Sequence, residues 1–263
     1  MPGLATHSVL SPDGLAVAYE RRGAGRPALV FVHGWSCDRT YWCHQMAHFA
    51  ATHQVVAIDL AGHGESGSGR SSWTMPAYGE DVAAVINELA LGEVILIGHS
   101  MGGDVIVEAA LLRPAVVKGL VWVDAYSSLG EPHTPESVEE FAAPFRTDFA
   151  GTTDRFVRGM FLPTSDPALV DWVARDMASA PPAVGLDELV YAVSNDGPIL
   201  ERLQRLTMPK VAINAEYRPT NRESLAHYGF ETVLMAGVAH FMMLEDPERF
   251  NRLLAETVAR LSD

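Results

Sequence analysis

Six short apolar runs, separated by longer amphipathic segments, constrain the fold more than any other feature of this 263-residue sequence. They are rich in Val, Ile and Leu: ALVFV (28–32), VVAID (55–59), VILIG (94–98), GLVWVD (119–124), KVAIN (210–214) and TVLMAG (232–237). Strands that are apolar on both faces belong to parallel sheets covered by helices. The alternation therefore predicts an α/β fold with a doubly wound, mostly parallel sheet.

Two of the intervening segments carry apolar residues at helical spacing. They are Met75, Tyr78, Val82, Val85, Ile86 and Leu89 in one segment, and Phe250, Leu253, Leu254, Val258 and Leu261 in the last. Asp246 followed by Pro247 is typical of a helix start, an N-cap and then a position that tolerates proline. Both segments are predicted to be amphipathic helices that pack on the sheet.

Residues 127–206 break the alternation, because this stretch has no strand-like run but many prolines, aromatic residues and methionines. This composition favours a helical cap or lid inserted after the sixth predicted strand. The predicted organisation is an α/β core of residues 1–126 and 207–263 with a cap of residues 127–206. If the cap closes over an active site, its apolar side chains favour a small, largely apolar substrate.

The charge balance excludes some partners. With 33 acidic and 19 basic residues the formal net charge is −14, which works against binding nucleic acid or anionic membranes. No segment approaches the ~20 apolar residues of a membrane span, and we see no signal peptide. Two cysteines give neither a disulfide framework nor a closed metal site. We expect a cytoplasmic protein with no metal, and self-association into a homo-oligomer stays open.

The segment Gly98-His99-Ser100-Met101-Gly102 follows a predicted strand and precedes a helix-like stretch. It matches the G-x-S-x-G nucleophile elbow, in which a strained turn lifts a serine above the carboxyl edge of the sheet. Glycine is needed on both sides because a side chain there would collide with the neighbouring backbone. Ser100 is therefore the predicted nucleophile.

With three further motifs, this elbow makes the sequence resemble the α/β-hydrolase family over nearly its whole length. The motifs are HGW (33–35), DLAGHGES (59–66), GHSMGG (98–103) and GVAHF (237–241). The resemblance implies that the backbone N–H groups of Trp35 and Met101 form an oxyanion hole. It also implies a catalytic triad and no cofactor.

A serine nucleophile needs a histidine to take its proton and a carboxylate to orient that histidine. Among ten histidines, His240 is the expected base because it lies between the last predicted strand and the last helix. His33, His63 and His99 each lie in a tight glycine turn and are expected to be structural.

The carboxylate is ambiguous, because in most of the family it follows the seventh strand, where this chain has Glu216-Tyr217-Arg218. Asp124, at the end of the sixth predicted strand, is one alternative, and some family members place their acid there. Glu216 is the other, one or two residues from the usual position. We expect Asp124 to be the acid in preference to Glu216.

The stretch from Gly62 to Gly67 also fits the G-x-G-x-x-G pattern of dinucleotide sites. No helix follows at once and no further strand carries the required acidic residue, so we expect a structural loop.

These patterns predict a cofactor-free serine hydrolase that cleaves an ester, thioester or lactone through an acyl-enzyme. A carbon–carbon bond hydrolase or a cofactor-independent oxygenase on the same scaffold is one alternative. A non-catalytic small-molecule receptor is the other.

Overall fold

The computed structural model describes residues 6–130 and 133–262, which form an eight-stranded sheet with helices on both faces. The strand order is β1-β2-β4-β3-β5-β6-β7-β8. The strands are β1 (His7–Leu10), β2 (Ala16–Arg22), β3 (Ala28–Val32), β4 (Val55–Ile58), β5 (Val94–His99), β6 (Val117–Val123), β7 (Lys210–Ala215) and β8 (Phe230–Met235). From β4 to β8 every neighbouring pair is parallel, so the predicted doubly wound sheet is confirmed.

The six predicted strands all form within two residues of their expected positions, whereas β1 and β2 were missed. These two strands pair antiparallel with each other, and β2 pairs antiparallel with β4. Every residue of β3, β4 and β5 is buried, but β1 alternates between half-buried and exposed positions. A hairpin at the edge of the sheet that is partly exposed to water has no long apolar run, so the pattern typical of buried strands does not predict it.

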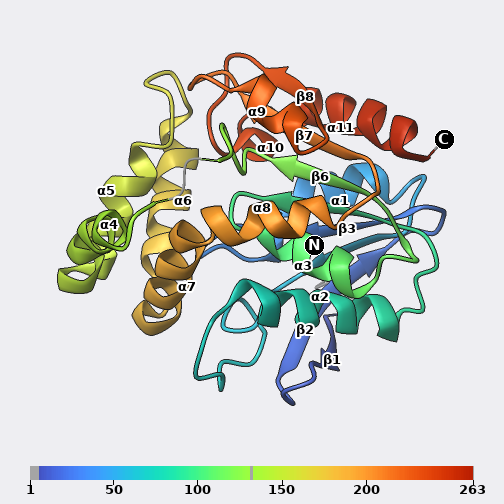
Figure 1. Cartoon of the computed structure of the whole chain (residues 1–263), viewed down its shortest axis with the longest axis horizontal. Helices are drawn as coiled ribbons and strands as arrows, with labels where there is room; N and C mark the ends of the chain where they lie inside the picture. Colours follow the sequence, from blue (N-terminus) through green and yellow to red (C-terminus); the bar gives the residue numbers. More distant parts are fainter. Residues whose placement is uncertain (1–5, 131–132, 263) are drawn as a thin grey trace.

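Helices cover both faces of the sheet. They are η1 (Arg39–Trp42), α1 (Cys43–Phe49), α2 (Met75–Glu88), α3 (Gly102–Leu112), α9 (Arg222–His227), α10 (Met242–Glu245) and α11 (Pro247–Ser262). Helix α2 packs against α3 and α1 against α11, and Figure 1 shows these pairs on opposite sides of the sheet. Asp246 accepts a hydrogen bond from the Arg249 backbone N–H at 3.1 Å, as expected for the N-cap of α11.

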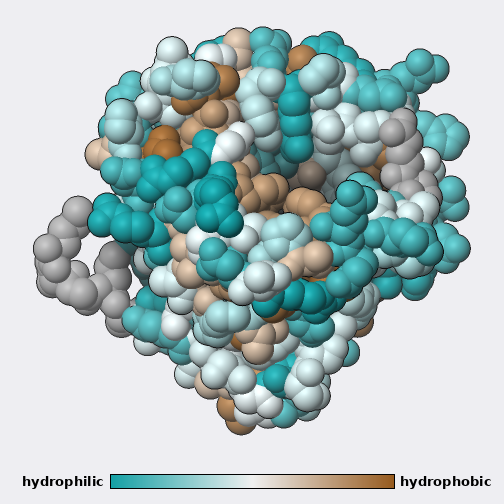
Figure 2. Space-filling model, turned by 90° about the vertical axis from the view of Figure 1, so that its left-hand side faces the viewer, coloured by the Kyte–Doolittle hydropathy of each residue, from teal (hydrophilic) through white to brown (hydrophobic). Residues whose placement is uncertain are grey.

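Between β6 and β7 the described residues form five helices. They are α4 (Pro135–Thr147), α5 (Phe149–Arg158), α6 (Pro167–Ala178), α7 (Pro182–Ser194) and α8 (Asp196–Gln204). Thr134 and Asp166 cap α4 and α6, and a proline follows each cap. Helices α4 to α7 gather beyond one end of the sheet (Figure 1). Figure 2 looks onto this side and shows apolar residues near the middle of the face, with hydrophilic residues around them.

Helix α7 is joined to the sheet domain by polar contacts. The Trp35 indole N–H donates to the Gly185 carbonyl at 2.7 Å, and the Tyr78 hydroxyl donates to the buried carboxylate of Glu188. His63 Nε2 lies 3.3 Å from the other oxygen of Glu188. Buried polar groups with fixed partners hold one geometry, so these bonds fix α7 against the core.

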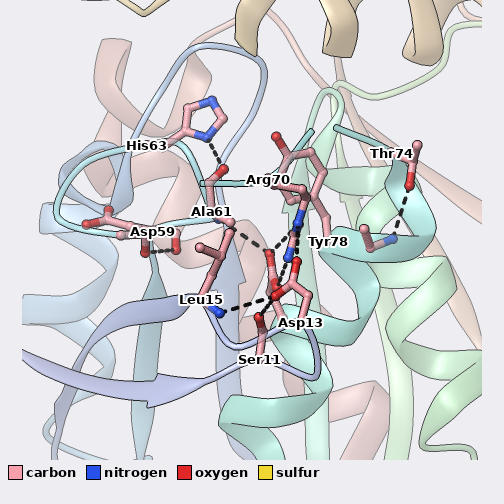
Figure 3. A network of polar contacts seen from close by, with 12 residues as sticks. Ser11, Asp13, Leu15, Asp59, Ala61, His63, Arg70, Thr74 and Tyr78 are labelled. Atoms are coloured by element: carbon pink, nitrogen blue, oxygen red, sulfur yellow. Dashed lines mark hydrogen bonds and ion pairs between the residues drawn. The ribbon is translucent and has the colours of Figure 1, made fainter. Parts of the chain in front are cut away.

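The loop from residue 59 to residue 70 is built around buried carboxylates. Asp59 accepts hydrogen bonds from the backbone N–H groups of Arg39 and Glu65, at 2.8 and 2.9 Å. Arg70 lies between Asp13 and Tyr78 (Figure 3) and donates to Asp13 at 2.7 Å. These bonds hold the loop beside the amino-terminal strands.

The glycine pattern at 62–67 forms successive turns and does not open a helix. Gly64 has a φ of +50°, and a Cβ atom there would overlap the Asp59 carboxylate. The side chain of Asp59 thus fills the concave side of the turn, where a dinucleotide site would hold its pyrophosphate.

Candidate functional site

Ser100 lies on a tight turn between β5 and α3. Its φ of +51° is in the left-handed region that non-glycine residues rarely adopt. A Cβ atom on Gly98 would overlap the Gly102 carbonyl, and one on Gly102 would lie 2.5 Å from the His33 carbonyl oxygen. The two glycines therefore let β5, α3 and the loop after β3 approach closely enough to hold Ser100 in this strained conformation.

His240 lies in the loop between β8 and α10, and several backbone contacts fix it. Its N–H donates to the Met160 carbonyl at 3.3 Å, and its own carbonyl faces His99 Nε2 at 2.9 Å. The preceding residue, Ala239, donates its N–H to the Glu245 carboxylate at 3.0 Å. The imidazole of His240 is buried and lies with Ser100 in the lining of one small cavity.

Asp124 directly follows β6 and contacts His240. Its Oδ2 lies 2.7 Å from His240 Nδ1, and the Asp124 side chain is fully buried. Asp124 has a φ of +47°, so a second left-handed residue sits at the carboxyl edge of the sheet. A carboxylate that accepts a hydrogen bond from Nδ1–H leaves Nε2 of the same ring unprotonated, as a general base requires.

The last residue of β7 and the residues that follow it surround Asp124 with donors. The Ala215 backbone N–H donates to Oδ1 at 3.0 Å, and the Tyr217 hydroxyl donates to Oδ2 at 3.2 Å. Arg218 Nη2 lies 3.4 Å from Oδ2. Burial by itself raises the pKa of Asp124, but the hydrogen bond from His240 and the charge of Arg218 outweigh it, so the pKa is lowered.

Glu216, the other candidate acid, is exposed at the end of β7. Its backbone N–H donates to the Met235 carbonyl at 3.1 Å, in continuation of the pairing between β7 and β8. The structure therefore brings Asp124, and not Glu216, to the ring of His240.

The three histidines expected to be structural are buried and bonded to nearby groups. His33 Nδ1 lies 2.8 Å from the Gly34 carbonyl oxygen, and the Leu60 N–H donates to His33 Nε2. Burial lowers the pKa of His99 to about 3, so its ring is neutral. His63 differs, because the desolvation that lowers its pKa is outweighed by Glu188, and the pKa is raised. Glu188 lies on α7, far from His63 along the chain, so no sequence motif connects the two residues.

A pocket of about 440 Å³ opens beside Ser100, between the sheet edge and the helices that follow β6. Its wall from the sheet domain includes Trp35, Met101 and Arg218, and its other wall is mainly apolar. That second wall includes Phe141, Phe156, Met160, Leu189 and Val193. Phe145 and Phe149 pack their edges against the ring of Trp35 instead.

A second, much smaller cavity of about 20 Å³ also touches Ser100. The surface that faces this cavity is almost entirely apolar, and it is formed by Trp35, Cys37, His99, Ser100, Met160, Met177, His240 and Phe241. Cys37, one of the two cysteines, thus lies in the wall of this cavity.

Trp35 and Met101 line the 440 Å³ pocket together with Ser100. Met101 follows Ser100 directly and precedes the first turn of α3, and Trp35 follows β3, the parallel neighbour of β5. Among the described residues, neither N–H donates to another protein group. Two unused donors beside a serine are suited to binding an oxyanion.

The family model of the alpha/beta hydrolase family matches residues 29–253. The chain belongs to the alpha/beta hydrolase family. None of the helices in the described part of this hydrolase-family chain is long and apolar enough to span a membrane. No cluster of three or more His, Cys, Asp or Glu among those residues is arranged to hold a metal ion.

Relatives of this alpha/beta hydrolase carry several activities in their names. It is 33% identical to the dihydrolipoyllysine-residue acetyltransferase component of an acetoin cleaving system from Pseudomonas putida, over 65% of this chain and 44% of that protein. The chain therefore spans less than half of that relative. It is 23% identical to 3-oxoadipate enol-lactonase 2 from Acinetobacter baylyi, over 100% of both chains.

Solved structures share the fold over nearly the whole chain. A thermophilic esterase from Thermogutta terrifontis is 23% identical with a TM-score of 0.84, covering 98% of this chain and 100% of that one. Est816, described as an N-acyl homoserine lactone degrading enzyme, is 27% identical with a TM-score of 0.82, covering 95% and 99% of the two chains.

Proposed function

We propose that this alpha/beta hydrolase is a cofactor-free serine hydrolase that cleaves an ester, thioester or lactone in a small, largely apolar substrate. The observation that carries the proposal is the 2.7 Å contact between His240 Nδ1 and the buried Asp124 carboxylate, beside the strained elbow of Ser100. Nucleophile, base and acid would come from the ends of β5, β8 and β6, at one edge of the sheet.

In the proposed reaction, His240 Nε2 accepts the Ser100 hydroxyl proton while Oγ attacks the substrate carbonyl carbon. The resulting oxyanion is bound by the Trp35 and Met101 N–H groups. The tetrahedral intermediate then expels the leaving oxygen or sulfur, which takes the proton from His240, and Ser100 holds the acyl group. Water, deprotonated by His240, releases the acid in the same two steps.

Asp124 would hold His240 in the right tautomer and stabilise the imidazolium that forms at each step. Its low pKa supports this role, because a carboxylate that stays ionised can offset a positive charge on the ring.

We propose further that residues 127–206 act as a cap over this site. Helices α4, α5 and α7 supply the apolar wall of the 440 Å³ pocket, and such a wall favours an apolar substrate. The names of two relatives, an enol-lactonase and an N-acyl homoserine lactone degrading enzyme, support the inclusion of lactones.

Turnover of p-nitrophenyl acetate and hexanoate by the purified protein tests the proposal. We expect turnover that falls by at least about 10³-fold in Ser100→Ala and in His240→Ala, because each variant removes one reacting group. If Ser100→Ala retained full activity, chemistry without an acyl-enzyme would replace the proposal. Saturable binding of these esters without any turnover would instead indicate a receptor.

A further inference from the structure

The two cavities that meet at Ser100 differ about twentyfold in volume, at 440 and 20 Å³. Trp35, Ser100 and Met160 line both, so Ser100 stands at the boundary between them. We infer that the enzyme selects methyl esters of bulky apolar acids, with the acyl group in the large pocket and the methoxy group in the small cavity. This inference rests on the proposed serine hydrolase function.

The position of His240 decides which fragment enters which cavity. His240 lines the small cavity but is absent from the lining of the large pocket. The leaving oxygen takes its proton from His240, so it must come within hydrogen-bond reach of that ring. The alcohol fragment therefore lies on the side of the small cavity, and the acyl fragment lies on the other side.

The size and lining of the small cavity set the length of the alcohol. A volume of about 20 Å³ is just above the roughly 10–15 Å³ needed to hold one water molecule. A methyl group fills a space of this size and gains dispersion contacts with its lining. Cys37 and Met177 are 3% and 2% exposed, so the wall that they form around the small cavity is buried.

The wall of the small cavity is held in place by a polar contact. Met177 lies on α6, and its neighbour Asp176 accepts a hydrogen bond from the hydroxyl of Tyr41 at 2.8 Å. Tyr41 is fully buried in the sheet domain, and its ring also packs at a tilt against the ring of Trp172 on α6. Because these contacts fix α6, the helix does not move aside for a larger alcohol as a loop would.

The reaction on such an ester is balanced without a further reactant. Ser100 Oγ forms a bond to the acyl carbon, the bond from that carbon to the methoxy oxygen breaks, and the Ser100 proton leaves as part of methanol through His240. Water then enters the vacated side and releases the bulky acid, so the proton returns to Ser100.

A set of esters of one acid tests the inference. We would measure kcat/KM for methyl, ethyl and butyl 4-phenylbutanoate, and for the reversed ester 4-phenylbutyl acetate. We expect the butyl ester and the reversed ester each to be at least tenfold poorer than the methyl ester, since misfit of one methylene already costs about tenfold or more. Equal rates for methyl and butyl esters, or a preference for the reversed ester, would overturn the inference.

Variants that enlarge the small cavity test whether this cavity limits the length of the alcohol. Met177→Ala is expected to raise the ratio of butyl to methyl ester kcat/KM by at least tenfold, and Met177→Val to raise it less. Met46→Ala truncates a buried methionine of α1 that lines neither cavity, so its ratio should stay at the wild-type value. Because both substrates meet the same enzyme sample, the ratio is independent of how much protein is folded.

The outcomes separate this inference from the proposed function. A protein that hydrolyses no ester, including p-nitrophenyl acetate, would overturn both. A protein that hydrolyses esters through Ser100 but whose butyl to methyl ratio is unchanged in Met177→Ala and Met177→Val would overturn the inference alone.

Discussion

The ends of β6 and β7 lie side by side at the same edge of the sheet, yet they carry opposite chemistry. After β6 the chain places a buried carboxylate, Asp124, with a left-handed backbone. After β7 it places an exposed carboxylate, Glu216, followed by two donors, Tyr217 and Arg218, which turn back to Asp124. One strand end supplies the acceptor for His240, and its neighbour supplies the groups that hold that acceptor.

This contrast shows why the position of an acid along the chain is a weaker guide than its surroundings. Parallel neighbours end at the same edge, so a carboxylate after either strand is close enough to serve the loop of His240. The deciding difference is burial, because a buried carboxylate with charged and polar partners keeps its ionised form and its orientation.

The largest expected effect is that of Asp124→Asn. The amide cannot balance an imidazolium and can favour the wrong tautomer of His240, so kcat should fall by about 10³- to 10⁴-fold. The measurement is hydrolysis of a p-nitrophenyl ester at neutral pH, with circular dichroism as a check on folding. A folded Asp124→Asn protein with near wild-type turnover would contradict the assignment of the acid.

Arg218→Gln should have the next largest effect. Losing this cation raises the pKa of Asp124 and makes protonation of the Asp124–His240 pair easier, so the acid limb of kcat/KM should move to higher pH. Arg218 is 38% exposed, so solvent screening keeps the expected shift below about one pH unit. Arg218→Lys retains the charge and should recover most of the shift, whereas an identical shift in both variants would mean that charge is not the cause.

Tyr217→Phe should have a smaller effect. It removes one neutral donor to Asp124 Oδ2 but leaves those of His240 and Ala215, and one such hydrogen bond is worth about 1 kcal/mol. We expect kcat to fall about fivefold, with little change in KM because the hydroxyl faces Asp124. A loss as large as that of Asp124→Asn would assign Tyr217 a direct part in the chemistry.

Glu216→Gln should have the smallest effect, within about twofold of wild type in kcat/KM. The side chain is exposed, and substitutions at such positions seldom change a protein by more than about 0.5 kcal/mol. A loss of kcat/KM by orders of magnitude in this variant would mean that Glu216, and not Asp124, is the acid that serves His240.

The buried strands could be predicted because a strand that is buried on both faces has a continuous apolar sequence, as in residues 28–32 and 94–98. The edge strand β1 alternates between half-buried and exposed residues, and its neighbour β2 is buried only at Val17, Ala18 and Tyr19, so neither has a long apolar run. The elbow around Ser100 was predictable for a similar reason, since its geometry admits only glycine at Gly98 and Gly102.

The partners of Asp124 could not be predicted, because side-chain contacts between β6 and β7 depend on three-dimensional packing. Tyr217 and Arg218 stood out in the sequence only as residues at a position where a carboxylate is usual. Two hydrogen-bond donors at that position indicate that the acid lies on another strand and that the donors bind it. Both Tyr217 and Arg218 donate to Asp124 Oδ2. The wall formed by Cys37 and Met177 left no pattern, because the two residues lie far apart in the chain.

The most direct test of the proposed triad is the rate at which a fluorophosphonate labels the protein, followed by intact mass and peptide mapping. For the wild type we expect one adduct, on Ser100, and none in Ser100→Ala. The labelling rate should fall by orders of magnitude in Asp124→Asn and stay unchanged in Glu216→Gln. Labelling at another residue, or an equal rate in wild type and Asp124→Asn, would contradict the triad of Ser100, His240 and Asp124.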